Sequence, residues 1–234
     1  MFRPVNYPRF AGFFNWTMTY RRDSDIFAPY GSFSQSSQPT SVETILNRVR
    51  GLPKPKLVAW VVSNCKTPSK REDFVSELQK HIPVDIFGKC GTLQCPGRRT
   101  NSECGNLLER DYMFYLAFEN SKCNDYVSEK FFATLELDIV PIVMGGANYS
   151  AIAPPGSYID ANGFSSARDL AEELKRLSKA REEYLKLFSW KAKTEVVDGY
   201  SQMGCNLCKA LHESKPDKTY QDLGGWWSDG GNCQ

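Results

Sequence analysis

Short apolar runs alternate with longer segments of helical periodicity through the middle of the chain. Four runs are rich in β-branched and aromatic residues and have the length of strands: residues 56–62, 84–87, 112–118 and 139–143. The first run, KLVAWVV, has no polar alternation, as expected for a strand buried on both faces of a parallel sheet. Three longer segments repeat apolar side chains at helical spacing: residues 67–82, 125–137 and 166–178. This alternation predicts an α/β fold with a doubly wound sheet, whose ligands bind beyond the carboxyl ends of the strands.

Polar residues mark the starts of two of the predicted helices. Thr67 followed by Pro68 is typical of an N-cap and the first helical residue. Ser166 and Asp169 resemble a capping box. Residues 88–106, between two strands, contain three cysteines and predict a loop.

The region before the first strand has a different composition. Residues 1–31 are rich in aromatic residues and arginine, whereas residues 32–55 are polar and interrupted by proline and glycine, as linkers are. A short amphipathic piece, residues 42–49, lies inside this linker. We therefore predict a domain boundary near Gly51.

Composition limits the classes of partner. The 234 residues, 41% hydrophobic and 24% charged, suit one large or two small globular domains. The net charge is +2 and the basic residues are spread along the chain, so we expect no nucleic-acid partner. No run of eighteen apolar residues occurs, and the first ten residues lack the pattern of a signal peptide. As written, the chain is expected neither to span a membrane nor to be targeted.

Cysteines and glycosylation motifs point the other way. The chain has eight cysteines, and Asn15 and Asn148 each begin an Asn-x-Ser/Thr motif. These features favour an oxidising, glycosylating compartment. The conflict disappears if the chain is the C-terminal piece of a longer protein whose membrane anchor lies upstream.

The Cys205-x-x-Cys208 pair is open to three interpretations: half of a zinc site, a redox couple or a disulfide. The other cysteines are unevenly spaced for a zinc ribbon, and only His81 and His212 could supply imidazoles. We therefore predict structural disulfides, with Cys205 and Cys208 as one candidate pair, and no metal.

Asp23-Ser24-Asp25 follows Arg21 and Arg22 and also has two interpretations. Two carboxylates separated by one residue can hold a divalent metal under a diphosphate. Alternatively, the aspartates pair with the two arginines in a charged turn. The residues alone leave both open.

Polar residues follow two of the predicted strands. Ser63 and Asn64 follow the first strand, and residues 119–121 follow the third. A nucleotide diphosphate requires cations for its phosphates and a carboxylate for its ribose diol, which Arg71, Lys130 and Glu129 could supply. Alternatively, Glu129 and Lys130 form a solvated helix surface and Arg71 caps a local pair.

Several long segments resemble the signature segments of the animal α1,3-fucosyltransferases: FFNWTMTYRRDSDIFAPYG (13–31), VAWVVSNC (58–65), YMFYLAFENSKCNDYVSEKFFATLELDIVPIVMGG (112–146), APPGSYIDANGF (153–164) and YLKLFSW (184–190). The resemblance implies the Rossmann-like C-terminal half of a GT-B glycosyltransferase, which holds the donor GDP-fucose. It implies that residues 1–50 are the end of the acceptor-side domain plus a linker. Residues 51–190 are then the donor domain and 191–234 a cysteine-rich tail.

The family's donor site transfers to this sequence by residue type and position. Arg71 and Lys130 are implied for the phosphates, Glu129 for the ribose, and Asn120 and Tyr126 around the nucleotide sugar. Four further positions are weaker matches: Ser63, Asn64, Tyr115 and Tyr30. The resemblance implies no required cofactor and no dedicated metal site, although a divalent metal could stimulate the reaction. It favours the structural interpretation of Asp23 and Asp25.

The tail, CNLCKALHESKPDKTYQDLGGWWSDGGNC (205–233), resembles that of the core-type invertebrate enzymes. This implies inverting transfer of fucose from GDP-β-L-fucose to the 3-hydroxyl of the asparagine-linked GlcNAc of N-glycans. The alternatives are transfer to outer-arm N-acetyllactosamine, an inactive GDP-binding fragment, and a disulfide-rich interaction domain. The family's general base lies in the acceptor-side half, so no catalytic residue is assigned here. The implied location is the Golgi lumen, within a type II membrane protein.

Overall fold

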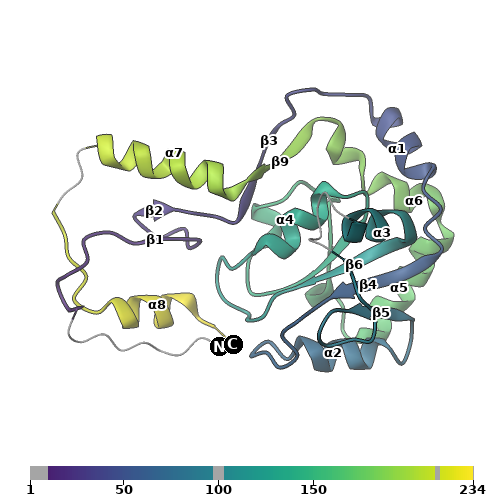
Figure 1. Ribbon diagram of the computed structural model, residues 1–234, viewed down its shortest axis with the longest axis horizontal. Coiled ribbons are helices and arrows are strands. Elements are labelled where there is room, and N and C mark those ends of the chain that lie inside the picture. The colour runs from purple at the N-terminus through teal and green to yellow at the C-terminus, as the bar shows by residue number, and fades with distance from the viewer. Residues whose placement is uncertain (1–9, 97–102, 214–216, 234) are drawn as a thin grey trace.

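The computed structural model describes residues 10–96, 103–213 and 217–233 (Figure 1). The strands are β1 (Met18–Thr19), β2 (Ile26–Phe27), β3 (Gly31–Gln35), β4 (Lys56–Val61), β5 (Val84–Phe87), β6 (Tyr112–Phe118), β7 (Val140–Met144), β8 (Ile159–Asp160) and β9 (Thr194–Asp198). The helices are α1 (Val42–Arg50), α2 (Arg71–Leu78), α3 (Glu103–Asp111), α4 (Glu129–Glu136), α5 (Ala167–Lys179), α6 (Arg181–Lys186), α7 (Gly199–His212) and α8 (Leu223–Gly231).

A five-stranded parallel sheet forms the larger part of the molecule, in the order β5-β4-β6-β7-β8. Its central strand β6 is buried along its whole length because helices cover both faces. Phe114, Leu116 and Phe118 pack with α1, α2, α5 and α6, whereas Tyr115 and Ala117 pack with α3 and α4. The four predicted strands and the α/β class are confirmed.

Two amphipathic helices follow the sequence prediction closely. In α5 the buried residues include Leu170, Leu174 and Leu177, and the Ser166 hydroxyl accepts a hydrogen bond from the Asp169 N–H. Helix α1 coincides with the amphipathic piece inside the predicted linker, and its Ile45 and Val49 are buried in the core of the sheet domain. The linker region is therefore partly integrated into the fold.

The starts of three helices differ from prediction. Helix α2 begins at Arg71 rather than after Thr67, because the Thr67 hydroxyl contacts Glu72 and Ser69 instead of capping a helix. Helix α4 begins at Glu129, since residues 125–128 form a turn that ends in the N-cap Ser128. Helix α3 replaces the end of the predicted loop 88–106, of which residues 97–102 lie outside the described part.

A smaller region lies beside the sheet domain and combines the two ends of the chain. Figure 1 shows β1, β2, α7 and α8 gathered on one side, with β3 and β9 running between this region and the sheet domain. Strand β3 pairs antiparallel with β9, from Gly31 opposite Asp198 to Gln35 opposite Thr194. The predicted tail 191–234 thus packs against residues of the predicted segment 1–50.

Three disulfides join segments around the sheet: Cys65–Cys90, Cys95–Cys104 and Cys123–Cys233. Cys104 is in the first turn of α3. The first disulfide connects the segments that follow β4 and β5. The third connects the segment between β6 and α4 to Cys233, two residues after the end of α8, across a sequence separation of 110. The segment that begins at Glu119 is therefore covalently attached to the smaller region.

None of the helices in the described residues is both long enough and apolar enough to cross a membrane.

Candidate functional site

The carboxyl ends of β4 and β6 lie side by side, because the two strands pair in parallel with Val58 opposite Phe114. Ser63 and Asn64 follow β4 and are exposed. Glu119 and Asn120 follow β6, where Glu119 is completely buried. The strand order therefore brings together the two strand ends identified in the sequence, at the edge where parallel sheets bind ligands.

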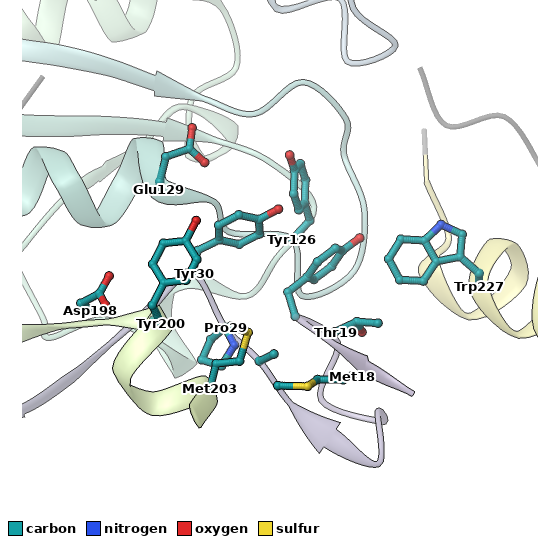
Figure 2. A pocket seen from close by; sticks show the side chains of 13 residues that line it. Met18, Thr19, Pro29, Tyr30, Tyr126, Glu129, Asp198, Tyr200, Met203 and Trp227 are labelled. Carbon is teal, nitrogen blue, oxygen red and sulfur yellow. The ribbon is translucent and has the colours of Figure 1, made fainter. Parts of the chain in front are cut away.

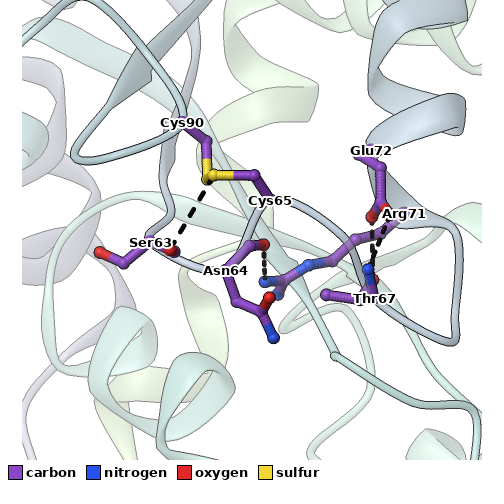
Figure 3. Close-up of a disulfide and its surroundings, with 7 residues drawn as sticks. All are labelled: Ser63, Asn64, Cys65, Thr67, Arg71, Glu72 and Cys90. Atoms are coloured by element: carbon purple, nitrogen blue, oxygen red, sulfur yellow. Dashed lines mark hydrogen bonds between the residues drawn. A yellow bond between two sulfur atoms is a disulfide. The ribbon is translucent and has the colours of Figure 1, made fainter. Parts of the chain in front are cut away.

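Arg71 is the first residue of α2 and is 97% buried. One terminal nitrogen donates to the Phe118 carbonyl at 2.6 Å. The other donates to the Asn64 carbonyl at 3.2 Å (Figure 3). Burial lowers the pKa of Arg71 from its ordinary value, and the nearby Glu119 charge opposes that shift. The guanidinium therefore joins the two strand ends.

A buried ion pair lies at the same edge. Lys130 Nζ donates to Glu119 Oε2 at 3.0 Å and to Ser128 Oγ at 2.7 Å, and the Lys130 side chain is 17% exposed. Glu119 Oε1 also accepts from the Ser128 N–H at 2.8 Å. Glu129 is on the outside, with its carboxylate 3.8 Å from Lys130 Nζ and its side chain 56% exposed. Lys130 therefore lies between the exposed Glu129 carboxylate and the buried Glu119 carboxylate, to which it is hydrogen-bonded.

Polar atoms without partners concentrate here. Four buried side-chain N and O atoms in the described residues have no hydrogen-bond partner: Arg71 Nε, Asn120 Oδ1, Tyr149 Oη and Gln202 Oε1. The first two belong to the strand ends. Tyr149 Oη lies beside Gly145 and Glu119, since a Cβ added at Gly145 would be 2.7 Å from it and 3.5 Å from Glu119 Cγ. Leaving such a group unpaired typically costs about 1–3 kcal/mol. We therefore expect a ligand or a bound water to supply the missing hydrogen bond.

A hollow of about 650 Å³ opens between this edge and the smaller region (Figure 2). Figure 2 shows Glu129, Tyr126 and Tyr30 on one side and Trp227 on another, with Met18 and Met203 below. Its charged lining residues are Glu129 and Asp198. Carboxylates and phenols suit the hydroxyl groups of a sugar, and aromatic faces suit a base or sugar ring.

Tyr20, Tyr30 and Tyr126 of this hollow stay protonated near neutral pH, because the pKa of each is raised. Burial, followed by the neighbouring Tyr30, raises the pKa of Tyr20 to about 12. Burial and the Glu119 charge raise the pKa of Tyr126, and burial and the Glu129 charge raise that of Tyr30. The rings of Tyr20 and Tyr126 lie 5.0 Å apart between centroids, so the wall is a packed aromatic cluster with neutral hydroxyls.

A second hollow of about 600 Å³ lies on the α2 side of the strand ends. Its lining includes Asn64, Lys66, Glu72 and Asp73. The Cys65–Cys90 disulfide lies next to Asn64, with Cys65 Sγ 3.9 Å from the Ser63 carbonyl oxygen (Figure 3). The disulfide thus fixes the loop on which Ser63 and Asn64 are exposed.

The structure separates the predicted donor residues into two groups around Glu119. Tyr30, Tyr126 and Glu129 line the larger hollow, with Lys130 directly behind Glu129. Arg71, Asn120, Ser63 and Asn64 cluster at the strand ends. Neither Arg71 nor Lys130 is among the residues that line the two hollows described above. Tyr115 is buried, with its hydroxyl 3.5 Å from the Val61 carbonyl oxygen, and does not reach the surface.

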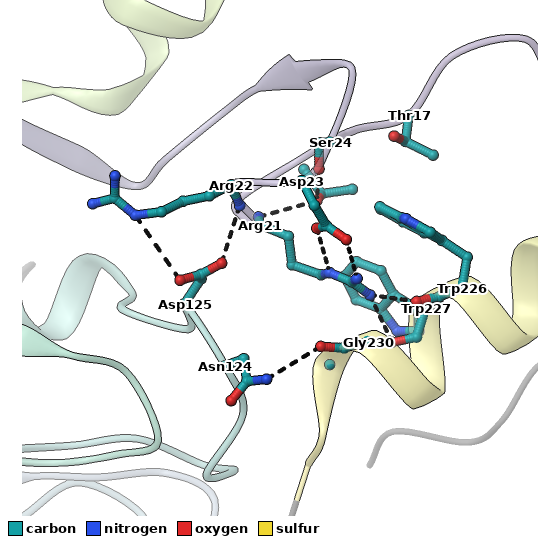
Figure 4. A network of polar contacts seen from close by, with 12 residues as sticks. Thr17, Arg21, Arg22, Asp23, Ser24, Asn124, Asp125, Trp226, Trp227 and Gly230 are labelled. Carbon is teal, nitrogen blue, oxygen red and sulfur yellow. Dashed lines mark hydrogen bonds and ion pairs between the residues drawn. The ribbon is translucent and has the colours of Figure 1, made fainter.

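Asp23 and Asp25 both have partners within the protein. Asp23 accepts from Arg21, whose guanidinium also donates to the Trp226 and Trp227 carbonyls and lies 4.1 Å from the Trp226 ring centre (Figure 4). Asp25 Oδ2 accepts from the Thr17 N–H at 2.8 Å and from the Tyr220 hydroxyl at 2.7 Å. Arg22 instead contacts Asp125. This motif attaches the N-terminal segment to α8 and the residues before it.

Cys205 and Cys208 differ from prediction. Both are exposed free thiols, one helical turn apart within α7, and not a disulfide. Their position in the body of a regular helix explains the difference. Residues three apart in a helix have Cβ atoms about 5–6 Å apart, whereas a disulfide requires about 3.5–4.5 Å. Among residues 10–96, 103–213 and 217–233, no group of three His, Cys, Asp or Glu side chains is arranged to hold a metal ion.

The two glycosylation motifs are on the surface. Asn15 is exposed and its amide donates to the Lys218 carbonyl at 2.9 Å. Asn148 is also exposed, and its side-chain oxygen accepts from Ser150 Oγ at 2.7 Å. Both positions are accessible, and their occupancy stays a prediction.

Sequence reasoning missed three residues of this region. Tyr20 and Trp227 line the hollow from segments far apart in the sequence, so no local pattern could connect them. Glu119 had a signal, because a carboxylate directly after a fully buried strand is expensive unless it is paired.

The sequence matches two family models. The model for the C-terminal part of glycosyltransferase family 10 (fucosyltransferase) matches residues 52–226. The model for the fucosyltransferase N-terminal part matches residues 3–31.

Several curated proteins are similar over nearly the whole chain. The chain is 42% identical to alpha-(1,3)-fucosyltransferase C of Drosophila melanogaster, covering 92% of this chain and 54% of that protein. It is 42% identical to glycoprotein 3-alpha-L-fucosyltransferase A of the same species, covering 94% and 44%. It is 36% identical to alpha-(1,3)-fucosyltransferase 7 of Mus musculus, covering 94% and 54%. The chain spans about half the length of these relatives.

Solved structures share the fold. A crystal structure of an α1,3-fucosyltransferase with GDP-fucose gives a TM-score of 0.54 at 20% identity, covering 70% of this chain and 49% of that one. One with GDP gives 0.54 at 20%, covering 69% and 48%. This likeness confirms the predicted Rossmann-like α/β fold.

Proposed function

The chain belongs to glycosyltransferase family 10, the fucosyltransferases, and we propose that it is the donor-binding half of an α1,3-fucosyltransferase that takes GDP-fucose. One observation carries the proposal. Two cations, Arg71 and Lys130, lie along the carboxyl edge of the sheet on either side of Glu119, together with two buried atoms that have no partner among the described residues, Arg71 Nε and Asn120 Oδ1, and a sugar-compatible hollow opens beside Glu129. Relatives with this fold have been crystallised with GDP-fucose and with GDP.

Arg71 and Lys130 are the proposed phosphate ligands. The start of α4 adds backbone N–H groups and the positive end of the helix dipole. Because the Arg71 terminal nitrogens bond the Phe118 and Asn64 carbonyls, phosphate binding there exchanges one of these bonds. We propose that these charges replace a dedicated metal, so activity persists in a chelator.

Glu129 is the proposed partner of the ribose hydroxyls, because its carboxylate is exposed in the hollow. Tyr126 and Tyr30 form its aromatic wall, and Asn120 offers an unpaired carbonyl oxygen. Ser63 and Asn64 are exposed close to the Arg71 guanidinium. Tyr115 supports the site from the core and makes no donor contact in this proposal.

The proposed reaction is inverting. The acceptor 3-hydroxyl attacks the anomeric carbon of GDP-β-L-fucose, the bond to the β-phosphate oxygen breaks, and GDP leaves with the bonding electron pair. Arg71 and Lys130 stabilise the charge that develops on the leaving diphosphate. The proton of the hydroxyl passes to a general base in the acceptor-side domain, so none of the residues described here is assigned that role.

The proposed acceptor is the asparagine-linked GlcNAc of N-glycans. Support comes from the tail and from the similarity to a Drosophila enzyme named as a glycoprotein 3-α-L-fucosyltransferase. The three disulfides fit an oxidising compartment, and we propose the Golgi lumen. Fucose transfer to a core N-glycopeptide but not to N-acetyllactosamine, by the enzyme with its acceptor-side domain, is expected. The reverse preference would contradict the acceptor.

Calorimetric titration of the chain with GDP tests donor binding. Lys130→Ala and Glu129→Ala are each expected to weaken GDP binding about 10- to 100-fold, as the loss of a charged hydrogen bond does. Lys175→Ala, at an exposed position of α5, is the matched control and should leave the affinity unchanged. Absence of binding at millimolar GDP would overturn the proposal.

A further inference from the structure

Glu119 is the most enclosed charge at the strand ends, and the proposed function gives it no part. Its side chain is completely buried. One carboxylate oxygen accepts from the Ser128 N–H at 2.8 Å, and the other accepts from Lys130 Nζ at 3.0 Å. The Ser128 hydroxyl lies 2.9 Å from the first oxygen and 2.8 Å from the second. The carboxylate therefore binds the N-cap and the second residue of α4.

The backbone around Glu119 holds α2 in the same way. Its carbonyl accepts from the Ser69 hydroxyl at 2.8 Å, and the Asn120 carbonyl accepts from the Ser69 N–H at 3.1 Å. The preceding carbonyl, of Phe118, accepts from Arg71 at 2.6 Å. Residues 118–120 thus fix the beginnings of both helices that carry the proposed phosphate ligands.

We propose that Glu119 is a positioning residue for donor binding, whose carboxylate holds the Lys130 ammonium and the first turn of α4 toward the diphosphate. The inference rests on the proposed function. A lysine has a flexible four-carbon stem, and ordering it on binding costs affinity. Holding it in advance removes part of that cost. A buried ion pair offsets its desolvation cost only if its geometry is good and further hydrogen bonds satisfy both groups. Glu119 meets this condition, and the same fixed geometry holds Lys130 in one place.

Two other roles predict different results. If Glu119 only screens the Lys130 charge, its removal raises the local potential and diphosphate binds more tightly. If Glu119 only supports the fold, its removal lowers stability and leaves the contribution of the phosphates unchanged. The affinity for GDP relative to guanosine distinguishes all three, because the ratio isolates the phosphate contribution.

Glu119→Gln is the primary variant, measured by calorimetry with GDP and with guanosine. The amide places an N–H₂ against one of the donors, which displaces Lys130. We expect the GDP-to-guanosine affinity ratio to fall about tenfold. Guanosine affinity should fall less than GDP affinity, since Glu129, the proposed ribose partner, is also in the first turn of α4. Asp138→Asn is the matched control, since Asp138 is also buried and accepts from a lysine, at the other edge of the sheet. It should lower stability and leave the ratio unchanged.

A double variant tests whether Glu119 acts through Lys130. Lys130→Met should lower the ratio, and adding Glu119→Gln should lower it no further. If Glu119→Gln does not fold, Ser128→Ala removes the hydroxyl that contacts both groups, with an expected loss of about threefold in the ratio. An unchanged or increased ratio in Glu119→Gln, or in Ser128→Ala where the former fails to fold, overturns the inference. Wild-type chain that binds no GDP overturns the proposed function first.

Discussion

Two buried carboxylates, Asp138 and Glu119, lie at opposite ends of the parallel strands of one sheet, which we call its amino edge and its carboxyl edge. Their surroundings differ in how completely the polar groups are hydrogen-bonded. Asp138 precedes β7 at the amino edge and accepts from Arg48 at 2.5 and 2.8 Å and from Lys191 at 3.0 Å. Lys54 closes the cluster by donating to three backbone carbonyls, of Glu109, Tyr112 and Asp138. Glu119 follows β6 at the carboxyl edge, amid three of the four unpaired buried polar atoms of the described residues.

The difference indicates what each edge contributes. Burial alone would raise the pKa of Asp138, but the bonds from Arg48 and Lys191 hold it below its ordinary value. No atom of the Asp138 cluster is among the unpaired atoms of the described chain, so this edge contributes to stability. At the carboxyl edge, buried polar atoms have no hydrogen-bond partner among the described residues, which lowers stability. Proteins keep such atoms where a ligand supplies the missing hydrogen bonds.

The largest expected effect is at the amino edge. Asp138→Asn leaves the buried Lys191 ammonium without its counter-charge, which typically costs about 3–5 kcal/mol of unfolding free energy. Denaturant unfolding measures this loss. Glu172→Gln, which removes a surface pair with Arg168, is the control and should cost under about 1 kcal/mol. Equal losses in the two variants would remove the distinction between structural and functional edges.

The carboxyl edge has buried polar atoms without partners among the described residues, but a disulfide, Cys123–Cys233, fixes the segment before α4. Replacing both Cys123 and Cys233 by serine frees the segment before α4 from the segment after α8, and should cost about 2–4 kcal/mol of unfolding free energy. Denaturant unfolding, with a thiol count to confirm the wild-type bridge, measures the change. The Cys95–Cys104 disulfide closes a loop of sequence separation 9, against 110 for Cys123–Cys233. Replacing Cys95 and Cys104 by serine should therefore cost less unfolding free energy. A larger cost for the shorter loop would contradict this explanation.

The sequence predicted the parts of this comparison that depend on local patterns. The β6 run is apolar because both its faces are buried, and Ser166 caps α5 through a contact three residues away. The starts of α2 and α4 were wrong because they depend on remote partners. Ser69 is held by the Glu119 carbonyl and Ser128 by the Glu119 carboxylate, across separations that no periodicity reports.

The candidate site was predicted by residue type more fully than by geometry. Resemblance selected Arg71, Lys130 and Glu129, and the topology placed them around neighbouring strand ends. It could not show that Arg71 is bonded to backbone carbonyls or that Lys130 is paired with Glu119. The cysteine count favoured disulfides, yet the pairings depend on which loops the fold brings together.

The pH dependence of stability should originate at the amino edge. Burial lowers the pKa of Lys54 from 10.5 to about 7, so the folded protein releases this proton near pH 7 whereas the unfolded chain holds it to near 10.5. The unfolded state binds more protons between these values, and Lys54 therefore makes stability rise with pH across this window. The slope from one such group is about 1.4 kcal/mol per pH unit at most.

Lys54→Met tests this by removing the titrating group. Unfolding free energies measured from pH 7 to 9 should rise less steeply than in the wild type, by about 1 kcal/mol per pH unit. Lys175→Met should keep the wild-type slope because its side chain is exposed. Parallel slopes in all three proteins would show that Lys54 is charged in the folded state throughout this range.

The smallest expected effect is at the carboxyl edge, where truncation should cost almost nothing. Asn120→Ala removes a buried oxygen that has no hydrogen-bond partner among the described residues. Stability should therefore stay within about 1 kcal/mol of wild type, or rise, while GDP affinity falls. Asn206→Ala is the matched control, because its amide donates to the Phe27 carbonyl at 2.7 Å and its loss should destabilise by about 1 kcal/mol. A loss of about 2 kcal/mol in Asn120→Ala would mean that the protein itself uses this oxygen. The carboxyl edge would then be saturated like the amino edge, and a ligand would have no unused bonds to complete there.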